Sequence, residues 1–90
     1  MGKYRLIFQD EAVKDLEIHR KIGDKVVLKR ISRIFAELEE HPQTGIGNPE
    51  RLRFGLSGLW SRRINLEHRI VYSIKDEVVE VTVVSARGHY

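Results

Sequence analysis

The sequence ends on two side chains that can take part in acid–base chemistry, His89 and Tyr90. Histidine has an unperturbed pKa of about 6.5, so His89 can donate a proton near neutral pH. Tyr90 can stack on a nucleobase or add a hydrogen bond. A third candidate, the carboxylate of Glu50, follows a loop rich in glycine and proline. The alternative is that Glu50 is a solvated loop residue and His89 a polar residue at a loose chain end.

A carboxylate, an imidazole and several arginines suit the cleavage of an RNA phosphodiester. RNA carries its own nucleophile, the 2′-OH beside the scissile phosphate. An enzyme therefore needs a base for that proton, an acid for the leaving 5′-oxygen, and cations for the charge of the transition state. We expect neither a metal site nor a cofactor, because the chain has no cysteine and its histidines lack the pair spacings of zinc sites. No glycine-rich phosphate loop is present either.

Positive charge is concentrated in the second part of the chain. Residues 51–90 contain seven Lys/Arg and four Asp/Glu, whereas residues 1–50 contain nine of each. The guanidinium group suits phosphate, so clustered arginines favour a polyanionic partner. A solubilising surface is the alternative. The clustered arginines are Arg51, Arg53, Arg62, Arg63 and Arg69.

Patterning predicts that the first half of the chain forms a strand and two helices. Alternation over residues 4–8 predicts the strand. Asp10 is the predicted N-cap of a helix over residues 11–22, and Asp24 that of a second helix over residues 25–41. The apolar residues expected to share one face of each helix are Val13, Leu16 and Ile22 in the first, and Val27, Ile31, Ile34, Phe35 and Leu38 in the second. The residues expected on the solvated or partner-binding face of the second helix are Lys29, Arg30, Arg33, Glu37 and Glu40.

The second half is predicted to supply the rest of a sheet. Residues 42–50 form a loop, and residues 51–54 have the pattern of a short additional strand. Alternation over residues 59–65 and 67–74 predicts two strands, and a β-branched run over residues 78–86 predicts the last. The order β-α-α-β-β-β indicates an α+β domain with both helices on one face of a small, mostly antiparallel sheet.

Strand alternation also predicts which arginines reach the sheet face without helices. Arg63 and Arg69 lie on neighbouring strands and emerge together on that face. Two such cations repel one another unless an anion comes between them, which outlines a phosphate clamp. Arg62 falls on the apolar row instead, and we expect it near an edge, where its stem can snorkel.

Composition indicates one globular domain over residues 1–90. Hydrophobic residues make up 41% and charged residues 32%, the balance of a folded soluble protein. No apolar run approaches the roughly 20 residues that span a bilayer, and no secretory signal is visible. We therefore expect a cytoplasmic protein that does not enter the membrane.

Residues 48–72 and the chain end resemble a known family. The stretch "NPERLRFGLSGLWSRRINLEHRIVY" and the terminal "GHY" are similar to the "NPEPL…LSGxWSRRIxxEHRxVY" stretch and final "HY" of the YoeB/Txe branch of the RelE superfamily. These are small toxins of bacterial type II toxin–antitoxin pairs. The resemblance departs at Arg53, where relatives often have lysine, and at Phe54, which is histidine in some relatives.

The resemblance implies a ribosome-dependent mRNA endoribonuclease that inhibits translation. By matching position, Glu50 is the expected general base and His89 the general acid. Arg63 and Arg69 are the expected phosphate and transition-state stabilisers, and Tyr90 orients the base. The residues assigned to RNA binding, with a structural role left open for the last of them, are Arg51, Arg53 and Arg62.

The same resemblance implies several partners besides the ribosome and mRNA. We expect a cognate antitoxin whose C-terminal segment wraps the domain, and operator DNA bound only by the toxin–antitoxin complex. Exposed strand edges are also compatible with a homodimer. Two other functions stay open: a non-catalytic ribosome or RNA binder that blocks translation, and a ParE-like inhibitor of DNA gyrase.

Overall fold

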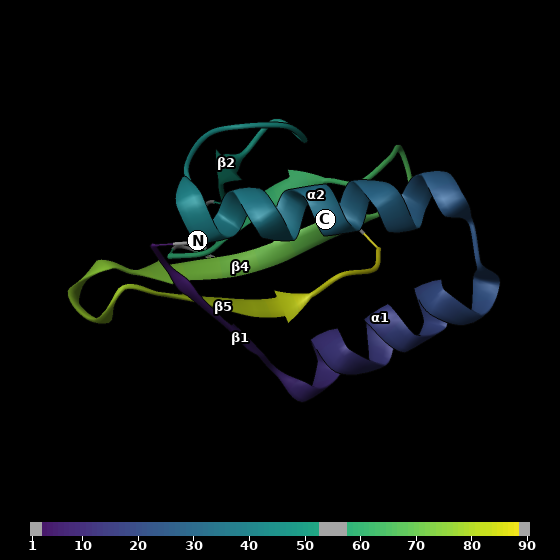
Figure 1. Cartoon of the computed structure of the whole chain (residues 1–90), viewed down its shortest axis with the longest axis horizontal. Coiled ribbons are helices and arrows are strands. Elements are labelled where there is room, and N and C mark those ends of the chain that lie inside the picture. The colour runs from purple at the N-terminus through teal and green to yellow at the C-terminus, as the bar shows by residue number, and fades with distance from the viewer. Residues whose placement is uncertain (1–2, 53–57, 89–90) are drawn as a thin grey trace.

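The computed structural model describes residues 3–52 and 58–88, which form a five-stranded sheet with two helices packed against it (Figure 1). The elements in chain order are β1 (Arg5–Phe8), α1 (Asp10–Ile22), α2 (Lys25–Glu40), β2 (Glu50–Arg51), β3 (Trp60–Arg63), β4 (Arg69–Lys75), the 3₁₀-helix η2 (Asp76–Val78) and β5 (Glu80–Ser85). The predicted α+β class is confirmed. The sheet has one strand more than the predicted order, because β2 forms at Glu50–Arg51, and residues 53–54 lie outside the described residues.

The strand order places β1, the first strand of the chain, beside β5, the last. The order is β1-β5-β4-β3-β2, with β1 parallel to β5 and every other pair antiparallel. Strands β2, β3 and β4, which carry the glutamate and arginines of interest, are therefore neighbours. Strand β1 forms the opposite edge.

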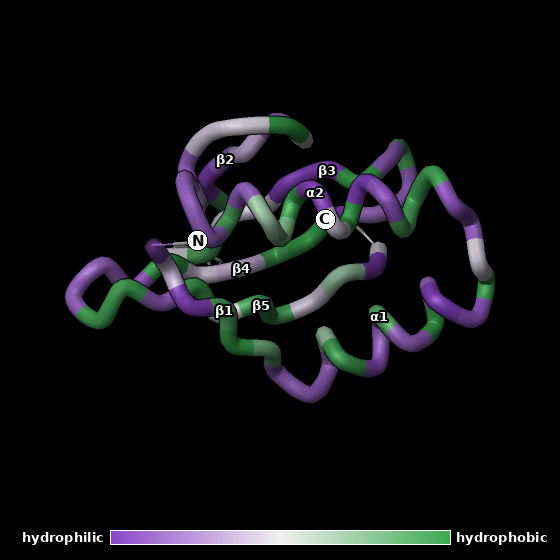
Figure 2. Tube along the Cα trace, in the orientation of Figure 1, coloured by the Kyte–Doolittle hydropathy of each residue, from purple (hydrophilic) through white to green (hydrophobic). Residues whose placement is uncertain are grey.

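The predicted buried face of α2 is confirmed. Ile31, Ile34 and Leu38 pack in the core, and Val27 and Phe35 are partly buried against it. Hydrophobic and hydrophilic residues alternate along the helix as it turns (Figure 2). Among the described residues, no helix combines the length and apolar character that a membrane span requires.

Helix α1 is rotated relative to its predicted face. Ala12 and His19 are buried, whereas Val13 and Ile22 are 49% and 65% exposed. The reason is a tertiary hydrogen bond: the buried His19 imidazole donates from Nε2 to the Ala86 carbonyl at 2.7 Å. Of the predicted apolar face, Leu16 packs against the core, whereas Val13 and Ile22 do not, so a polar contact shifts the buried side of this helix from the one that apolar spacing predicted.

A β-bulge redirects the end of β5. Tyr72 pairs with Val83, but the residue before Tyr72 pairs with Ser85, so Val84 is left without a partner in β4. Such a bulge reverses the alternation of side chains. Ala86 consequently returns to the core and is fully buried.

The two helix starts give a matched test of capping. Asp24→Ala should lower the free energy of unfolding by about 1 kcal/mol, because the Asp24 carboxylate accepts from the amides of Val26 and Val27. Asp10→Ala should lose about 0.5 kcal/mol or less, because Asp10 is the first residue of α1, and its N-cap, Gln9, makes no side-chain capping bond. Urea unfolding followed by circular dichroism measures both. Equal losses would contradict these cap assignments.

Candidate active site

Glu50 and Arg69 meet on the sheet face opposite the helices. The Arg69 guanidinium donates to Glu50 Oε1 at 2.7 Å and to Ser61 Oγ at 3.2 Å. Ser61 of β3 pairs with Glu50 in the β2–β3 register. The same serine therefore adjoins Glu50 and accepts from Arg69. The Glu50 side chain is 47% exposed and that of Arg69 is 20% exposed. The expected base and one expected stabiliser are therefore in contact and accessible.

Arg63 lies directly opposite Arg69 across the β3–β4 pair. Opposite residues of an antiparallel pair point to the same face, with Cβ atoms about 5 Å apart. Arg63 is exposed. The prediction that these two arginines emerge together is confirmed. Ser61 has the same parity in "WSRR" as Arg63, a signal that could have added it to the site.

Arg62 is buried, and of the two roles left open for it this geometry supports the structural one. It lies opposite Ile70 of β4, and its side chain is 0% exposed, so the expected snorkelling of its stem toward solvent does not occur. The guanidinium donates to Glu37 Oε1 at 2.7 Å and to the Tyr72 hydroxyl at 3.2 Å. Glu37 is correspondingly turned inward, with 16% of its side chain exposed, and does not belong to the solvated face of α2.

The same group of side chains holds the loop that leads to Glu50. Arg62 donates to three loop carbonyls and Tyr72 to a fourth, while Glu37 accepts from the Ile46 amide at 2.9 Å. The geometry of the loop therefore follows from a charge buried between α2 and the sheet. The carbonyls bound by Arg62 are those of His41, Thr44 and Ile46, and Tyr72 binds that of Pro42.

Two glycines let this loop approach the buried charge. Gly45 has a φ of 127°, and a Cβ there would overlap the Glu37 carboxylate. Gly47 has a φ of 84°, and its carbonyl accepts from the Arg63 amide at 2.6 Å. A Cβ on Gly47 would lie 2.7 Å from the Arg63 carbonyl oxygen. Glycine is thus required both by conformation and by space.

The charge states of Glu37 and Tyr72 at neutral pH favour the hydrogen bonds of this network. Burial alone would raise the pKa of Glu37, but the hydrogen bond from the Ile46 amide and the Arg62 guanidinium outweigh it and hold that pKa below 4.5. Burial raises the pKa of Tyr72 above 10.0, against the opposing effect of Arg62. Glu37 is therefore a carboxylate and Tyr72 a neutral phenol that can donate to its carbonyl partner.

Arg51 is not brought to the arginine face. It pairs with Trp60 in the β2–β3 register, and its guanidinium lies 5.9 Å from the centre of the Trp60 ring. Neighbouring residues of a strand point to opposite faces, so Arg51 points away from the face on which Glu50 lies. A role for Arg51 beside Arg63 and Arg69 has no support in this geometry.

His89, Tyr90, Arg53 and Phe54 lie outside the described residues, so the assignments made for them stay predictions. Gly88, the residue before His89 in the sequence, is described. Its carbonyl accepts from the amide of Arg69 at 2.9 Å. The last described residue is thus bound to the first residue of β4.

Two arginines and a carboxylate on an open sheet face can bind an anion and accept a proton. A phosphate between Arg63 and Arg69 would meet two guanidinium groups, and would compete with Glu50 for the second of them. Within residues 3–52 and 58–88, no group of three or more His, Cys, Asp or Glu residues is arranged to hold a metal ion.

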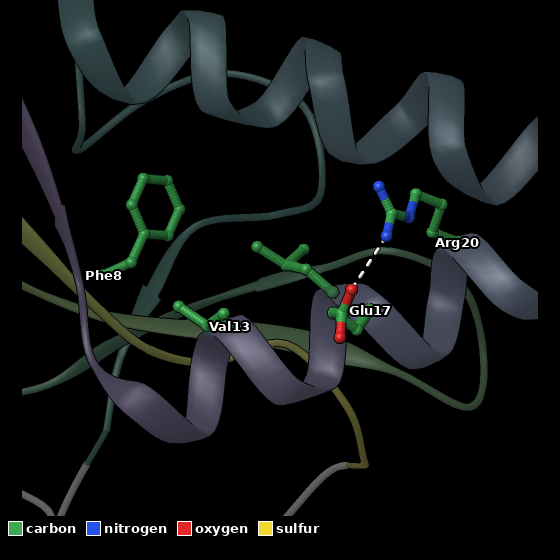
Figure 3. Close-up of a pocket in the computed structure, with 5 residues that line it drawn as sticks. Phe8, Val13, Glu17 and Arg20 are labelled. Carbon is green, nitrogen blue, oxygen red and sulfur yellow. Dashed lines mark hydrogen bonds and ion pairs between the residues drawn. The ribbon is translucent and has the colours of Figure 1, made fainter.

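A pocket elsewhere on the domain has a different character. It lies beside β1 and α1, and the Arg20 guanidinium contacts Glu17 Oε1 at 2.8 Å on its rim (Figure 3). Strand β1 and the Glu50-bearing strand are at opposite edges of the sheet. This pocket offers apolar surface and a paired charge, with no base free for chemistry. Its lining residues are Phe8, Val13, Leu16, Glu17 and Arg20.

The chain matches a known protein family over most of its length. Residues 8–90 match the model of the YoeB-like toxin of bacterial type II toxin–antitoxin systems. The chain belongs to this family. It is 49% identical over 68 residues to the toxin YoeB of Synechocystis, an alignment that covers 76% of this chain and 77% of that protein. The resemblance predicted from the "WSRR" and "EHR" motifs is therefore confirmed.

Solved structures of YoeB proteins share the fold. A YoeB/ParE toxin from Agrobacterium tumefaciens superposes with a TM-score of 0.87 at 30% identity, covering 96% of this chain and 99% of that one. The YoeB dimer of Staphylococcus aureus gives a TM-score of 0.84 at 32% identity, covering 99% of this chain and 100% of that one. S. aureus YoeB is also known in a heterotetrameric complex with YefM, where it superposes with a TM-score of 0.81 at 32% identity and the same coverage.

The depressed pKa of Glu37 makes stability depend on pH. A carboxylate whose pKa is lowered on folding stabilises the fold above about pH 4.5, and that contribution is lost as pH falls through the folded value. Glu37→Gln should therefore cost about 2 kcal/mol at pH 7, and the difference from the parent should shrink toward pH 3. Glu40→Gln, an exposed position on the same helix, is the control. Urea unfolding at each pH measures this, and a constant difference would contradict it.

Proposed function

We propose that this toxin is a ribosome-dependent mRNA endoribonuclease that needs no metal ion. The observation that carries the proposal is the contact between Glu50 and Arg69, with Arg63 opposite, on the face of the sheet that the helices leave open. A base and two phosphate-binding cations are the groups that cleavage of RNA by its own 2′-OH requires.

The reaction transfers the phosphate from the 5′-oxygen to the 2′-oxygen of the same strand. Glu50 takes the proton of the 2′-OH as the new O–P bond forms, and His89 protonates the departing 5′-oxygen. Arg63 and Arg69 stabilise the extra negative charge on the phosphorane. The products are a 2′,3′-cyclic phosphate and a 5′-OH. Tyr90 orients a neighbouring base by stacking.

The ion pair between Glu50 and Arg69 must open for the substrate to bind as proposed. A phosphate that takes the Arg69 guanidinium as its partner replaces the Glu50 carboxylate there. Binding of the message thereby frees the carboxylate to reach the 2′-OH.

The ribosome is proposed to hold the message on this face. Arg63 and Arg69 lie opposite one another on the sheet face without helices, at the end of the β3–β4 pair. We also propose that Arg53 binds RNA. A surface of this kind suits a small protein that enters a larger body in which the substrate is already positioned.

A cognate antitoxin is the proposed regulator. S. aureus YoeB occurs in a complex with YefM and as a dimer, which supports both an antitoxin and self-association here. We propose that the antitoxin covers the arginine face and so excludes RNA. The pair would bind operator DNA together, in the cytoplasm.

A non-catalytic block of translation is the second candidate, because the arginine face alone can bind RNA by displacing counterions. Primer extension on a message translated with purified toxin separates the two. Discrete new 5′ ends that mark cut RNA support the enzyme. Stalled ribosomes on an intact message support the block.

Removing either half of the ion pair should abolish cutting. Arg69→Ala and Glu50→Gln should each slow cleavage on translating ribosomes by about a hundredfold or more, as loss of a transition-state or proton-transfer group does. Arg5→Ala is the control, since Arg5 lies on β1 at the far edge of the sheet, where it pairs with Glu80. Cleavage at the parental rate by the first two variants, with the fold intact, would defeat the assignment.

A further inference from the structure

The segment that leads to the chain end is bound to α1 on one side. The Ala86 amide donates to Asp15 Oδ2 at 3.0 Å, and the Ala86 carbonyl accepts from His19 Nε2 at 2.7 Å. Ala86 is fully buried and lies just beyond the bulge of β5. Both polar groups of its backbone are therefore held by side chains, although no strand continues there.

The segment is bound to the start of β4 on the other side. The Gly88 amide donates to His68 Nδ1 at 3.0 Å, and the Gly88 carbonyl accepts from the Arg69 amide at 2.9 Å. Gly88 has a φ of 74°, a conformation that glycine adopts readily and that it would also leave readily without restraint. Residues 86–88 thus form a clasp with both end residues fixed by two hydrogen bonds.

The His68 ring is itself held in one orientation. Its Nδ1 accepts from the Gly88 amide, and its Nε2 lies 3.2 Å from Glu67 Oε2. Asn65 Oδ1 accepts from the His68 amide at 2.8 Å and fixes the turn. The His19 ring packs edge-on against it, with centres 5.0 Å apart.

We propose that His68 is a positioning residue for the terminal His89–Tyr90 pair. This inference rests on the proposed function, in which His89 and Tyr90 act on the substrate. The Gly88 amide is the last backbone donor before His89 in the described chain, and His68 supplies its acceptor beside Arg69. By fixing that peptide, His68 reduces the backbone freedom from which the terminal acid must be ordered for each turnover.

A matched pair of substitutions isolates the acceptor. His68→Asn keeps an acceptor oxygen close to where Nδ1 lies, whereas His68→Gln carries its oxygen farther out, toward the place of Nε2. Both remove the ring contact with His19 and keep a neutral amide. Single-turnover cleavage on translating ribosomes should be about tenfold slower for His68→Gln. The toxin concentration for half-maximal rate should be unchanged, and His68→Asn should cut at close to the parental rate.

Hydrogen exchange tests the clasp without relying on activity. By NMR, the Gly88 amide of the parent and of His68→Asn should exchange slowly, and that of His68→Gln about tenfold faster or more. The amide of Ile34 in the core should be unaffected. Should a variant fail to fold, replacing the Gly88 amide by an ester removes the same donor with every side chain in place, and should slow cleavage as His68→Gln does.

The outcomes separate the inference from the proposed function. Parental cleavage and parental Gly88 exchange in His68→Gln, or equal loss of activity in both variants, would overturn the positioning role. A parent toxin that cuts no message would overturn the endoribonuclease. The exchange measurements would still decide whether His68 holds Gly88.

Discussion

The arrangement of this toxin depends on a guanidinium buried between a helix and a sheet. A buried charge costs several kcal/mol unless it is paired and fully hydrogen-bonded. Arg62 meets that condition, because its five N–H groups reach a carboxylate, a phenol and three loop carbonyls. No buried side-chain polar atom among the described residues lacks a partner. Helix α2, strand β3 and the loop before Glu50 can therefore adopt only positions that satisfy this one side chain.

The candidate site is assembled from segments that are separately fixed to this frame. The loop places Glu50 at the sheet edge, and the β3–β4 pair places Arg63 and Arg69 opposite one another. The clasp at residues 86–88 leads to His89 and Tyr90. Each of these segments is held through its backbone by strand pairing or by side chains outside the proposed reacting set, and the Arg69 side chain makes its own contacts with Glu50 and Ser61. An open face built in this way can be covered by a partner protein without any rearrangement of the core.

Sequence reasoning predicted the parts that follow from periodicity. The face of α2 and the joint emergence of Arg63 and Arg69 could be predicted because 3.6-residue and two-residue repeats dictate them. The cap at Asp24 could be predicted because an aspartate before a helix can accept from its first amides. Sequence reasoning failed where a polar contact overrides the apolar pattern, as with Arg62, whose partners come from the loop and α2, and with the face of α1, which is set by His19 and Ala86. The bulge at Val84 left no signal in a run of β-branched residues. A long motif match identified the family when local patterns could not.

The central claim is that RNA is cut by its own 2′-OH within a site containing Glu50, Arg63 and Arg69. The most direct measurement uses a message with a single 2′-deoxynucleotide on the 5′ side of the mapped cleavage point, translated in the presence of the toxin. The account predicts that this message stays intact, that the same change one nucleotide downstream leaves cutting unaffected, and that the unmodified message yields a 2′,3′-cyclic phosphate end. Cleavage of the deoxy-substituted message at the same phosphate, or a free 3′-OH on the upstream fragment, would contradict it.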